Sequence, residues 1–413
     1  MNKKKLFNDP VYGFITIHSE LIFDIIEDPL FQRLRRIKQM GLSDFVYPGA
    51  LHTRFHHALG AMHLMGVTLN TLRSKGHDIS EKEYESALIA ILLHDVGHGP
   101  FSHALEASIL TGVHHEKISF LIMKSLNRKF DGMLEMALQM FCNTYARPFF
   151  HQLVSSQLDI DRLDYLQRDC YFTGVSEGTI GADRIIKMLD IVDERIVVEE
   201  KGIYSIESFL SARRFMYWQV YLHKTGISAE EMLIQVVKRA RYLLRNGEKV
   251  FATPDLLRFM EQDITLENFE CDESCLQSFA AIDDYDIWGA IKMWVNHPDK
   301  VLSTISRMLL DRKIFKVILS GEEPERAFVK QVAKQITQQF NLSEEELPYF
   351  LIEGSTSNAA YLAGGETINI LTKKGNIMDI AEASDLPNIK AMSKIVKKYY
   401  VCWPKSTSIS YER

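Results

Sequence analysis

The sequence contains few cysteines, no long apolar run and no excess of positive charge, and each absence excludes a class of protein. Its 413 residues include only five cysteines, an odd and scattered set that argues against a secreted disulfide framework. The longest aliphatic run is residues 87–93, far short of the roughly 20 residues that cross a bilayer. A formal net charge of −6 argues against binding nucleic acid over the whole chain. No apolar signal segment follows the three lysines near the start, so we expect a cytoplasmic protein.

The composition is that of a globular chain with an unusual distribution of histidine. Hydrophobic residues make up 46% and charged residues 25%, which is enough apolar material for a full core. Ten of the 14 histidines lie between His52 and His115, in less than a sixth of the chain. Histidine is the commonest metal ligand and carries protons near neutral pH, so this segment predicts a chemical site.

The spacing of apolar residues predicts a mostly helical chain. Helices are expected over residues 31–40, 53–72, 81–94, 115–126, 133–142 and 152–167. The helix over residues 81–94 has a nearly all-apolar end, which predicts burial, and the glycines and proline of residues 97–100 end it. A strand pair over residues 195–199 and 203–205 is expected next, followed by helices over residues 206–223 and 229–245.

The pattern changes after Gly247. Thr253 and Pro254 supply the N-cap and first residue of another helix. Strand-like segments follow at residues 349–352, 367–372 and 376–380, the last two joined through the turn residues 373–375. We therefore predict two units, residues 1–247 and residues 248–413, of which the second serves assembly.

Three segments hold side chains that bind metal ions: His57, the adjacent pair His94 and Asp95, and Asp161. Adjacent helical residues point about 100° apart, so both members of the pair reach one ion only near a helix end. Imidazole and carboxylate ligands without thiolate suit Mn, Fe, Zn or Mg. An isolated histidine on an apolar helix is more often a hydrogen-bonded core residue, so ligand types alone leave both interpretations open.

The sequences around these residues are more specific. Residues 52–60 read HTRFHHALG, residues 92–103 read LLHDVGHGPFSH, and residues 159–169 read DIDRLDYLQRD. In this order the segments resemble the HD-domain phosphohydrolases and, within them, the deoxynucleoside triphosphate triphosphohydrolases. The resemblance runs from residue 8 to residue 226, a little over half of the chain. It implies a mainly α fold, with an HD-domain helical core, short β-hairpins and a smaller α+β C-terminal region.

The resemblance also implies roles for individual residues. The four metal ligands correspond to His57, His94, Asp95 and Asp161, which would hold a divalent Mn, Fe, Mg or Zn ion, while His56 is not expected to be a ligand. The residues near the scissile phosphate correspond to His98, His103, Glu106 and His115. Because the leaving 5′ alkoxide is a strong base, the reaction needs a general acid, and we predict His103 for this role, with His115 and Glu106 behind it.

A second set of residues is expected to bind the nucleotide. Phosphate contacts correspond to Arg54, Arg162 and Arg213, and the sugar-lining residues correspond to Gln39, Tyr165, Asp169 and Tyr221. A tyrosine packed against the 2′ position leaves no space for a ribose hydroxyl. The implied activity is therefore metal-dependent hydrolysis of deoxynucleoside triphosphates to deoxynucleoside and inorganic triphosphate.

Two alternatives remain beside this activity. One is an HD phosphohydrolase that acts on a nucleoside monophosphate, a cyclic nucleotide or an alarmone, and the other is a non-catalytic nucleotide sensor. The sugar-lining set argues against the first alternative, and the intact ligand order and the acidic net charge argue against the second.

In vertebrate relatives, a regulatory guanine-nucleotide site forms between subunits. The corresponding residues here are Lys5, Asn8, Glu27, Gln32 and Arg35. This predicts a homo-oligomer, dimer or tetramer, that a nucleotide stabilises by binding only the assembled form. The alternative is that Arg33, Arg35, Arg36 and Lys38 form a solvated helix face.

Overall fold

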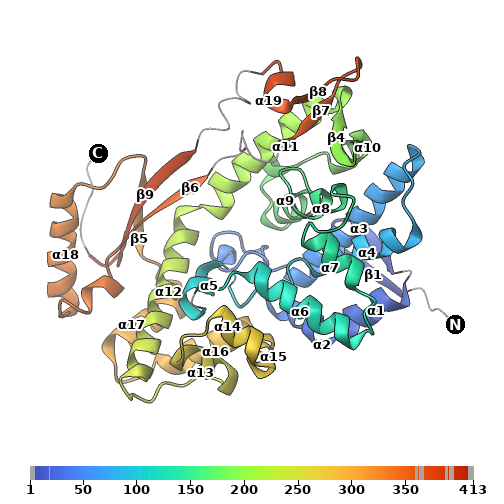
Figure 1. Ribbon diagram of the computed structural model, residues 1–413. Helices are drawn as coiled ribbons and strands as arrows, with labels where there is room; N and C mark the ends of the chain where they lie inside the picture. Colours follow the sequence, from blue (N-terminus) through green and yellow to red (C-terminus); the bar gives the residue numbers. More distant parts are fainter. Residues whose placement is uncertain are drawn as a thin grey trace.

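The structure is a computed structural model that describes residues 5–17, 19–101, 103–110, 112–358, 361, 367–386, 389 and 395–407, without the side chains of His103 and Ala107. Within these residues the chain is mainly helical with small sheets of short strands, which confirms the predicted fold class (Figure 1). No helix in this part of the chain combines the length and apolar composition that a membrane crossing requires.

The helical core is built around α3 (Arg54–Ser74), which packs against α4 (Glu81–Leu93) and α9 (Ile160–Thr173). The predicted helices over residues 53–72 and 81–94 are thereby confirmed. A capping box starts α4, because Ser80 Oγ accepts from the Glu83 amide at 3.2 Å and the Glu83 carboxylate accepts from the Ser80 amide at 2.9 Å. The end of α4 is buried, so this helix delivers His94 into the core. The surrounding helices are α5 (His103–Ile109), α6 (His115–Lys129), α7 (Glu135–Phe141) and α8 (Phe149–Val154).

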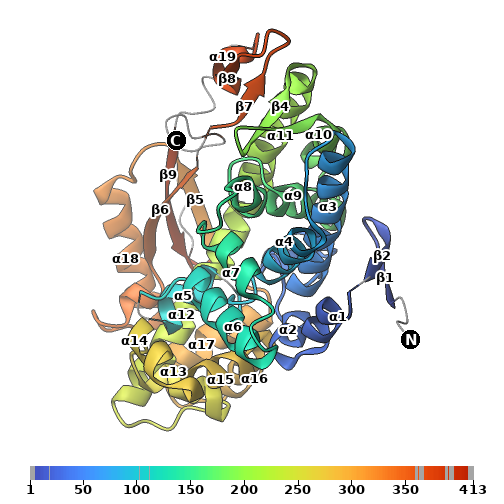
Figure 2. The same ribbon diagram turned by 45° about the vertical axis from the view of Figure 1, so that its right-hand side comes forward.

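An antiparallel hairpin precedes the core. β1 (Lys5–Asp9) pairs with β2 (Gly13–Ile17), and Ile15 and Ile17 are buried on its inner face. Figure 2 shows this hairpin at the edge of the molecule, beside α1 (Glu20–Glu27) and α2 (Pro29–Gln32). No pattern in the sequence predicted this hairpin.

The predicted helix over residues 31–40 is wrong in its second half. After α2 the chain forms a short 3-10 helix, η1 (Arg33–Arg36), and Ile37 is extended. The cause is tertiary pairing, because the carbonyl of Ile37 accepts from the Arg54 amide at 3.0 Å and the Gln39 amide donates to the His52 carbonyl at 3.0 Å. The pairing brings Gln39 beside the start of α3.

The predicted continuous helix over residues 152–167 is also wrong. The chain breaks between α8 and α9, where Asp159 accepts from the amides of Ser156 and Arg162, each at 2.7 Å. Asp159 is therefore the N-cap of α9, and the break sets the direction in which Asp161 points.

The strand over residues 195–199 is confirmed as β4 (Arg195–Glu199), but its predicted partner is wrong. β4 pairs with the preceding strand β3 (Leu189–Val192) across Asp193 and Glu194, which both have positive φ. Residues 203–205 instead begin α11 (Ile203–Met216). Next come a π-helical turn, η5 (Tyr217–Tyr221), and α12 (Lys224–Arg245), the long helix that crosses the molecule in Figure 1.

The C-terminal half adds a helical group and two sheets. The predicted hairpin around residues 373–375 is confirmed as β7 (Asn369–Leu371) and β8 (Ile377–Asp379), whereas the strand predicted at residues 349–352 begins only at Ile352. β7 also pairs in parallel with β4, so the C-terminal half returns to the first half of the chain. The second sheet has the order β5 (Lys316–Ser320), β9 (Val396–Trp403) and β6 (Ile352–Asn358).

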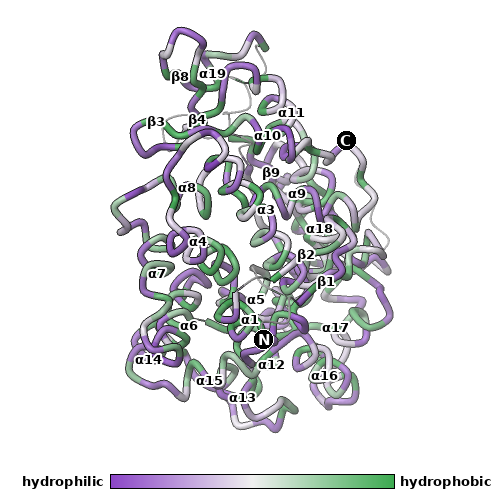
Figure 3. Tube along the Cα trace, turned by 90° about the vertical axis from the view of Figure 1, so that its right-hand side faces the viewer, coloured by the Kyte–Doolittle hydropathy of each residue, from purple (hydrophilic) through white to green (hydrophobic). Residues whose placement is uncertain are grey.

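The remaining elements are short connections and further helices. They are η2 (Ser43–Phe45), η3 (Ser176–Gly178), α10 (Ala182–Met188), η4 (Glu200–Gly202), α13 (Pro254–Glu261), α14 (Leu266–Cys271), α15 (Glu273–Ala281), α16 (Asp284–Trp294), α17 (Lys300–Leu310), α18 (Arg326–Phe340), η6 (Leu347–Tyr349) and α19 (Ile380–Ala383). Hydrophobic and hydrophilic residues alternate along most helices, as expected for elements with one buried face (Figure 3).

Candidate active site

The structure brings the four predicted metal ligands together from three helices. His57 comes from α3, His94 and Asp95 from the end of α4, and Asp161 from the first turn of α9. The Nε2 atoms of His57 and His94 lie 3.1 and 3.3 Å from Oδ1 of Asp161. Asp95 completes the group, with Oδ1 3.4 Å from His94 Nε2 and Oδ2 3.9 Å from His57 Nε2.

Hydrogen bonds on the far side of each ring orient both imidazoles. His57 Nδ1 lies 2.7 Å from Oδ2 of the buried Asp164, and His94 Nδ1 lies 2.7 Å from the carbonyl oxygen of Ile91. A proton on each Nδ1 satisfies these acceptors, which leaves the lone pair of each Nε2 directed at Asp161. This is the usual arrangement of histidines that bind a metal.

These residues fit a divalent cation. The two Nε2 atoms are buried and have no hydrogen-bond partner of good geometry, although a carboxylate oxygen lies beside both. His57, His94 and Asp161 thus offer ligand atoms that all lie within 4.8 Å of one another. A nitrogen and carboxylate set of this kind holds Mn, Fe, Zn or Mg without distinguishing between them.

The electrostatics of the cluster also favour a cation. Burial lowers the pKa of His57, but the carboxylates of Asp161 and Asp164 outweigh burial and raise it to about 10. Burial also lowers the pKa of His94, but the carboxylates of Asp95 and Asp161 outweigh burial, so this pKa is raised as well. The neighbouring imidazoles of His57 and His94 hold the pKa of the Asp161 carboxyl well below its usual range, although burial opposes this shift. A metal ion that binds here competes with protons for these sites.

A second group extends the site away from α3. Oδ1 of Asp95 lies 3.4 Å from His98 Nε2, and the rings of His98 and His115 stack with their centroids 3.8 Å apart. The buried guanidinium of Arg54 donates to Oδ2 of Asp95. Burial and the charge of Arg54 hold the pKa of His98 well below its ordinary value, so His98 is a neutral imidazole here.

Glu106 orients His115. Its Oε1 accepts from the backbone amide of His115 at 2.9 Å, and its Oε2 lies 3.3 Å from His115 Nδ1. Glu106 belongs to α5, which begins at His103, whose side chain lies outside the described part of the chain. The role predicted for His103 therefore stays a prediction.

Two of the three predicted phosphate-binding arginines, Arg162 and Arg213, have side-chain donors without a partner. Arg162 pairs with Asp159 through Nη1 and leaves Nε without a partner, and the buried Arg213 leaves Nε and Nη1 without one. Buried donors of this kind are uncommon and mark positions where a ligand or water completes the bonding.

The predicted sugar-lining residues form a linked group. The Tyr221 hydroxyl donates to Oδ2 of Asp169 at 2.8 Å, and His52 Nε2 lies 2.7 Å from Oδ1 of the same carboxylate. The ring of Tyr165 meets that of Tyr221 edge to face at 6.1 Å. The side-chain oxygen of Gln39 is buried without a partner. Sequence reasoning did not identify His52 as a partner of Asp169, although its place in the first motif was a signal.

A cavity of about 550 Å³ opens beside the metal cluster, and its lining adds residues that sequence reasoning missed. Lys117 lies in the first turn of α6, where the helix dipole disfavours a cation, and His151 comes from α8. The cavity also meets His94, Asp161 and Arg162. Lys117 therefore adds positive charge to the lining of this cavity.

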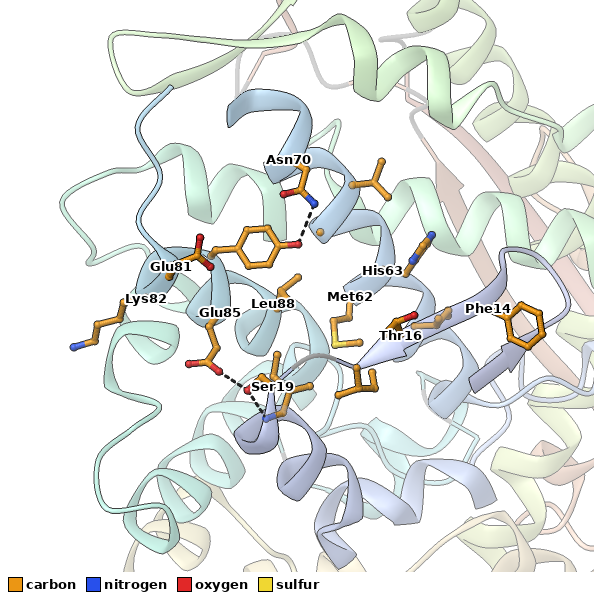
Figure 4. Close-up of a pocket in the computed structure, with 16 residues that line it drawn as sticks. Phe14, Thr16, Ser19, Met62, His63, Asn70, Glu81, Lys82, Glu85 and Leu88 are labelled. Carbon is orange, nitrogen blue, oxygen red and sulfur yellow. Dashed lines mark hydrogen bonds between the residues drawn. The ribbon is translucent and has the colours of Figure 1, made fainter. Parts of the chain in front are cut away.

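A larger cavity, of about 680 Å³, lies between β2, α3 and α4 (Figure 4). Four of its polar residues pair with one another, since Asn70 donates to the Tyr84 hydroxyl at 3.3 Å and Ser19 donates to Glu85. It contains none of the predicted ligands, so the smaller cavity at the metal cluster is the candidate active site.

The structure places part of the predicted regulatory set in one cluster. Arg35 Nε donates to Gln32 Oε1 at 2.8 Å, and its guanidinium lies 3.6 Å from the ring centroid of Phe55. Lys5 Nζ lies 3.1 Å from the ring centroid of Phe23. The other two members, Asn8 in β1 and Glu27 at the end of α1, have exposed side chains.

His56, the neighbour of His57, is not part of the metal cluster. Its Nδ1 accepts from the backbone amide of Thr53 at 3.2 Å and so caps the start of α3. The capping contact gives this histidine a structural role.

Comparisons with known proteins agree with this geometry. A model of the HD domain matches residues 54–169, and a model of the HD associated region matches residues 180–266. A crystal structure of a phosphohydrolase from Bacteroides thetaiotaomicron is 52% identical, with a TM-score of 0.94 over 98% of this chain and 100% of that one. Uncharacterized protein YwfO from Bacillus subtilis is 31% identical over 401 residues, which cover 93% of this chain and 88% of that protein.

The chain therefore belongs to the HD-domain phosphohydrolases, a family of hydrolases. Its relatives also include the Dictyostelium discoideum protein named deoxynucleoside triphosphate triphosphohydrolase SAMHD1 homolog, 32% identical over 268 residues. That match covers 60% of this chain and about half, 51%, of the relative.

Proposed function

We propose that this phosphohydrolase cleaves deoxynucleoside triphosphates into deoxynucleoside and inorganic triphosphate with the help of a divalent metal ion. The observation that carries the proposal is a concentration of unsatisfied buried polar atoms on Gln39, His57, His94, Arg162 and Arg213. Each such atom costs about 1–3 kcal/mol when nothing pairs with it. A ligand with a cation, phosphates and a sugar would satisfy all of them.

In this proposal His57, His94, Asp95 and Asp161 hold the metal. A bound divalent ion supplies Lewis acidity and positive charge at the reacting phosphorus. Arg54, Arg162 and Arg213 add fixed positive charge around the phosphates, and a guanidinium can bind two phosphate oxygens at once. The charge that develops on the phosphate oxygens is thus met by groups already in place.

The remaining residues hold the sugar and move the proton. Asp169, bonded to Tyr221 and His52, keeps lone pairs for a sugar hydroxyl. Tyr165 stands beside Tyr221 and would exclude a 2′ hydroxyl. His103 remains our choice of general acid for the 5′ oxygen, with His115, held by Glu106, close to the same phosphate.

A nucleotide panel tests the proposal. The purified protein is incubated with Mn²⁺ or Mg²⁺ and with each deoxynucleoside triphosphate, the matching ribonucleotides, monophosphates, a cyclic nucleotide and an alarmone. We expect deoxynucleoside to form from the deoxynucleoside triphosphates, and none with a His94→Ala/Asp95→Ala variant. Turnover of only the monophosphate, the cyclic nucleotide or the alarmone would overturn the proposed substrate class.

A further inference from the structure

The junction between α15 and α16 contacts the loop that follows the His94–Asp95 pair. Asp284, the first residue of α16, is 4% exposed. Its Oδ1 accepts from the backbone amide of Phe101 at 3.0 Å, and its Oδ2 accepts from the backbone amide of Lys38 at 2.9 Å. One carboxylate from the C-terminal half thus binds two segments of the catalytic core.

Phe101 needs such support because its backbone is strained. Its φ is +51°, a left-handed conformation that is a genuine outlier for a bulky side chain. Strain of this kind persists only where the surroundings enforce it. The surroundings here are the bond to Asp284 and an edge-to-face contact with Trp288, one turn further along α16, at 5.9 Å.

Both backbone segments that Asp284 binds continue into residues of the candidate active site. Phe101 precedes α5, which carries Glu106, and Glu106 in turn binds His115. Lys38 precedes Gln39, whose amide donates to the carbonyl of His52 at 3.0 Å. The carboxylate of Asp284 is therefore bonded both to the segment that leads to the predicted phosphate-binding residues and to the segment that leads to the predicted sugar-lining residues.

Arg33 braces the same loop from the other direction. Its guanidinium is fully buried, and Nη1 donates to the carbonyl oxygens of Val96 at 3.0 Å and His98 at 2.9 Å. Nη2 donates to the carbonyl of Ile282 at 3.4 Å, so the same guanidinium also contacts the α15–α16 junction.

We propose that Asp284 is a positioning residue of the HD centre, which fixes the strained Phe101 turn and the Lys38 segment so that Glu106, His115 and Gln39 face one substrate. The proposal rests on the proposed function only for its activity readout. Burial raises the pKa of Asp284 to about 6 although both amides lower it, so the carboxylate is maintained at an energetic cost. A buried charge that serves packing alone would be replaceable by an apolar side chain.

Two variants and one control test this proposal. Asp284→Ala removes both acceptors, and Asp284→Asn keeps the shape but turns an NH₂ group toward one of the two amides. The control, Asp299→Ala, removes an acidic N-cap from α17 that pairs with Arg239 away from the site, and so destabilises the fold without touching the loop. Metal content, kcat, KM and hydrogen exchange of the amides are measured for each protein.

We expect Asp284→Ala to lower kcat about 10- to 100-fold with KM and metal content nearly unchanged, and Asp284→Asn to give a smaller loss. Exchange should accelerate at residues 37–40 and 98–106 in both Asp284 variants and stay slow there in Asp299→Ala. Wild-type kcat in both Asp284 variants, or exchange that rises evenly over the chain as in the control, would overturn the proposal. If no deoxynucleotide is cleaved, the proposed function is wrong. The hydrogen-exchange rates at residues 37–40 and 98–106 then still test whether Asp284 positions these segments.

Discussion

Nδ1 of His57 lies 2.7 Å from Oδ2 of Asp164, and this contact decides which edge of the imidazole faces Asp161. Asp164 is held in turn by Arg168, which donates to both of its oxygens at 3.0 Å and also to Asp9 at 2.7 Å. His57, Asp164, Arg168 and Asp9 are all buried. The orientation of one metal ligand therefore depends on a chain of charged contacts that reaches the N-terminal hairpin.

The first prediction follows from this contact. Asp164→Asn should weaken metal binding about 10- to 100-fold, because the residue that orients a ligating histidine sets its tautomer and basicity. Metal titration of the purified variant measures the loss. Asp190→Asn is a matched control, since Asp190 also pairs with a histidine, His77, outside the metal cluster. Equal affinity in Asp164→Asn and Asp190→Asn would contradict the assignment.

The second prediction concerns the stability of the metal-free protein. The pKa of His57 is raised from its ordinary value of 6.5 to about 10, so the stabilisation it brings is complete below about pH 6.5 and is lost as the pH rises through about 10. We expect the Tm of metal-free protein to fall between pH 7 and pH 10, and to fall less steeply in His57→Gln. If Tm falls equally steeply with pH in the wild-type protein and in His57→Gln, His57 is not the group that binds this proton.

The third prediction concerns Lys117 at the cavity beside the metal cluster. Lys117→Gln should weaken inhibition by inorganic tripolyphosphate about tenfold, because a charge-assisted bond to an anion is lost. Lys124→Gln, on the same helix but outside the cavity lining, is the control. An unchanged inhibition constant in Lys117→Gln would remove this residue from the phosphate site.

The fourth prediction is assembly controlled by nucleotide. With dGTP, light scattering should report a larger oligomer, and hydrolysis of a second deoxynucleotide should accelerate. Arg35→Ala should abolish both effects, since Arg35 contacts Gln32 and Phe55 in the predicted regulatory cluster. A fixed mass without stimulation by dGTP would leave an oligomer that needs no regulatory nucleotide.

The metal ligands could be predicted from the sequence because the information is local. His94 and Asp95 end a helix whose apolar run and terminating glycines are visible in the sequence, and the gathered histidines indicate chemistry. The resemblance then supplied the order of the ligands. The geometry agrees, since His57, His94 and Asp161 offer ligand atoms within 4.8 Å of one another.

What could not be predicted depends on contacts between distant residues. Helical periodicity suggested a helix through Met40, but pairing of residues 37–39 with residues 52–54 makes this segment extended. The bonds from Asp284 span 183 and 246 residues, and no local pattern reports them. The strand partner of β4 was misplaced because Asp193 and Glu194 form a left-handed turn without glycine.

The central claim, attack of water at the α-phosphorus within the HD centre, is tested most directly by the products formed in ¹⁸O-labelled water. ³¹P NMR of the reaction with a deoxynucleoside triphosphate and Mn²⁺, quenched with chelator, identifies both the bond cleaved and the phosphorus that takes the label. We predict intact triphosphate with ¹⁸O on one terminal phosphorus, unlabelled deoxynucleoside, and no product from the His94→Ala/Asp95→Ala variant. Deoxynucleoside monophosphate with pyrophosphate, or label in the deoxynucleoside, would contradict the account.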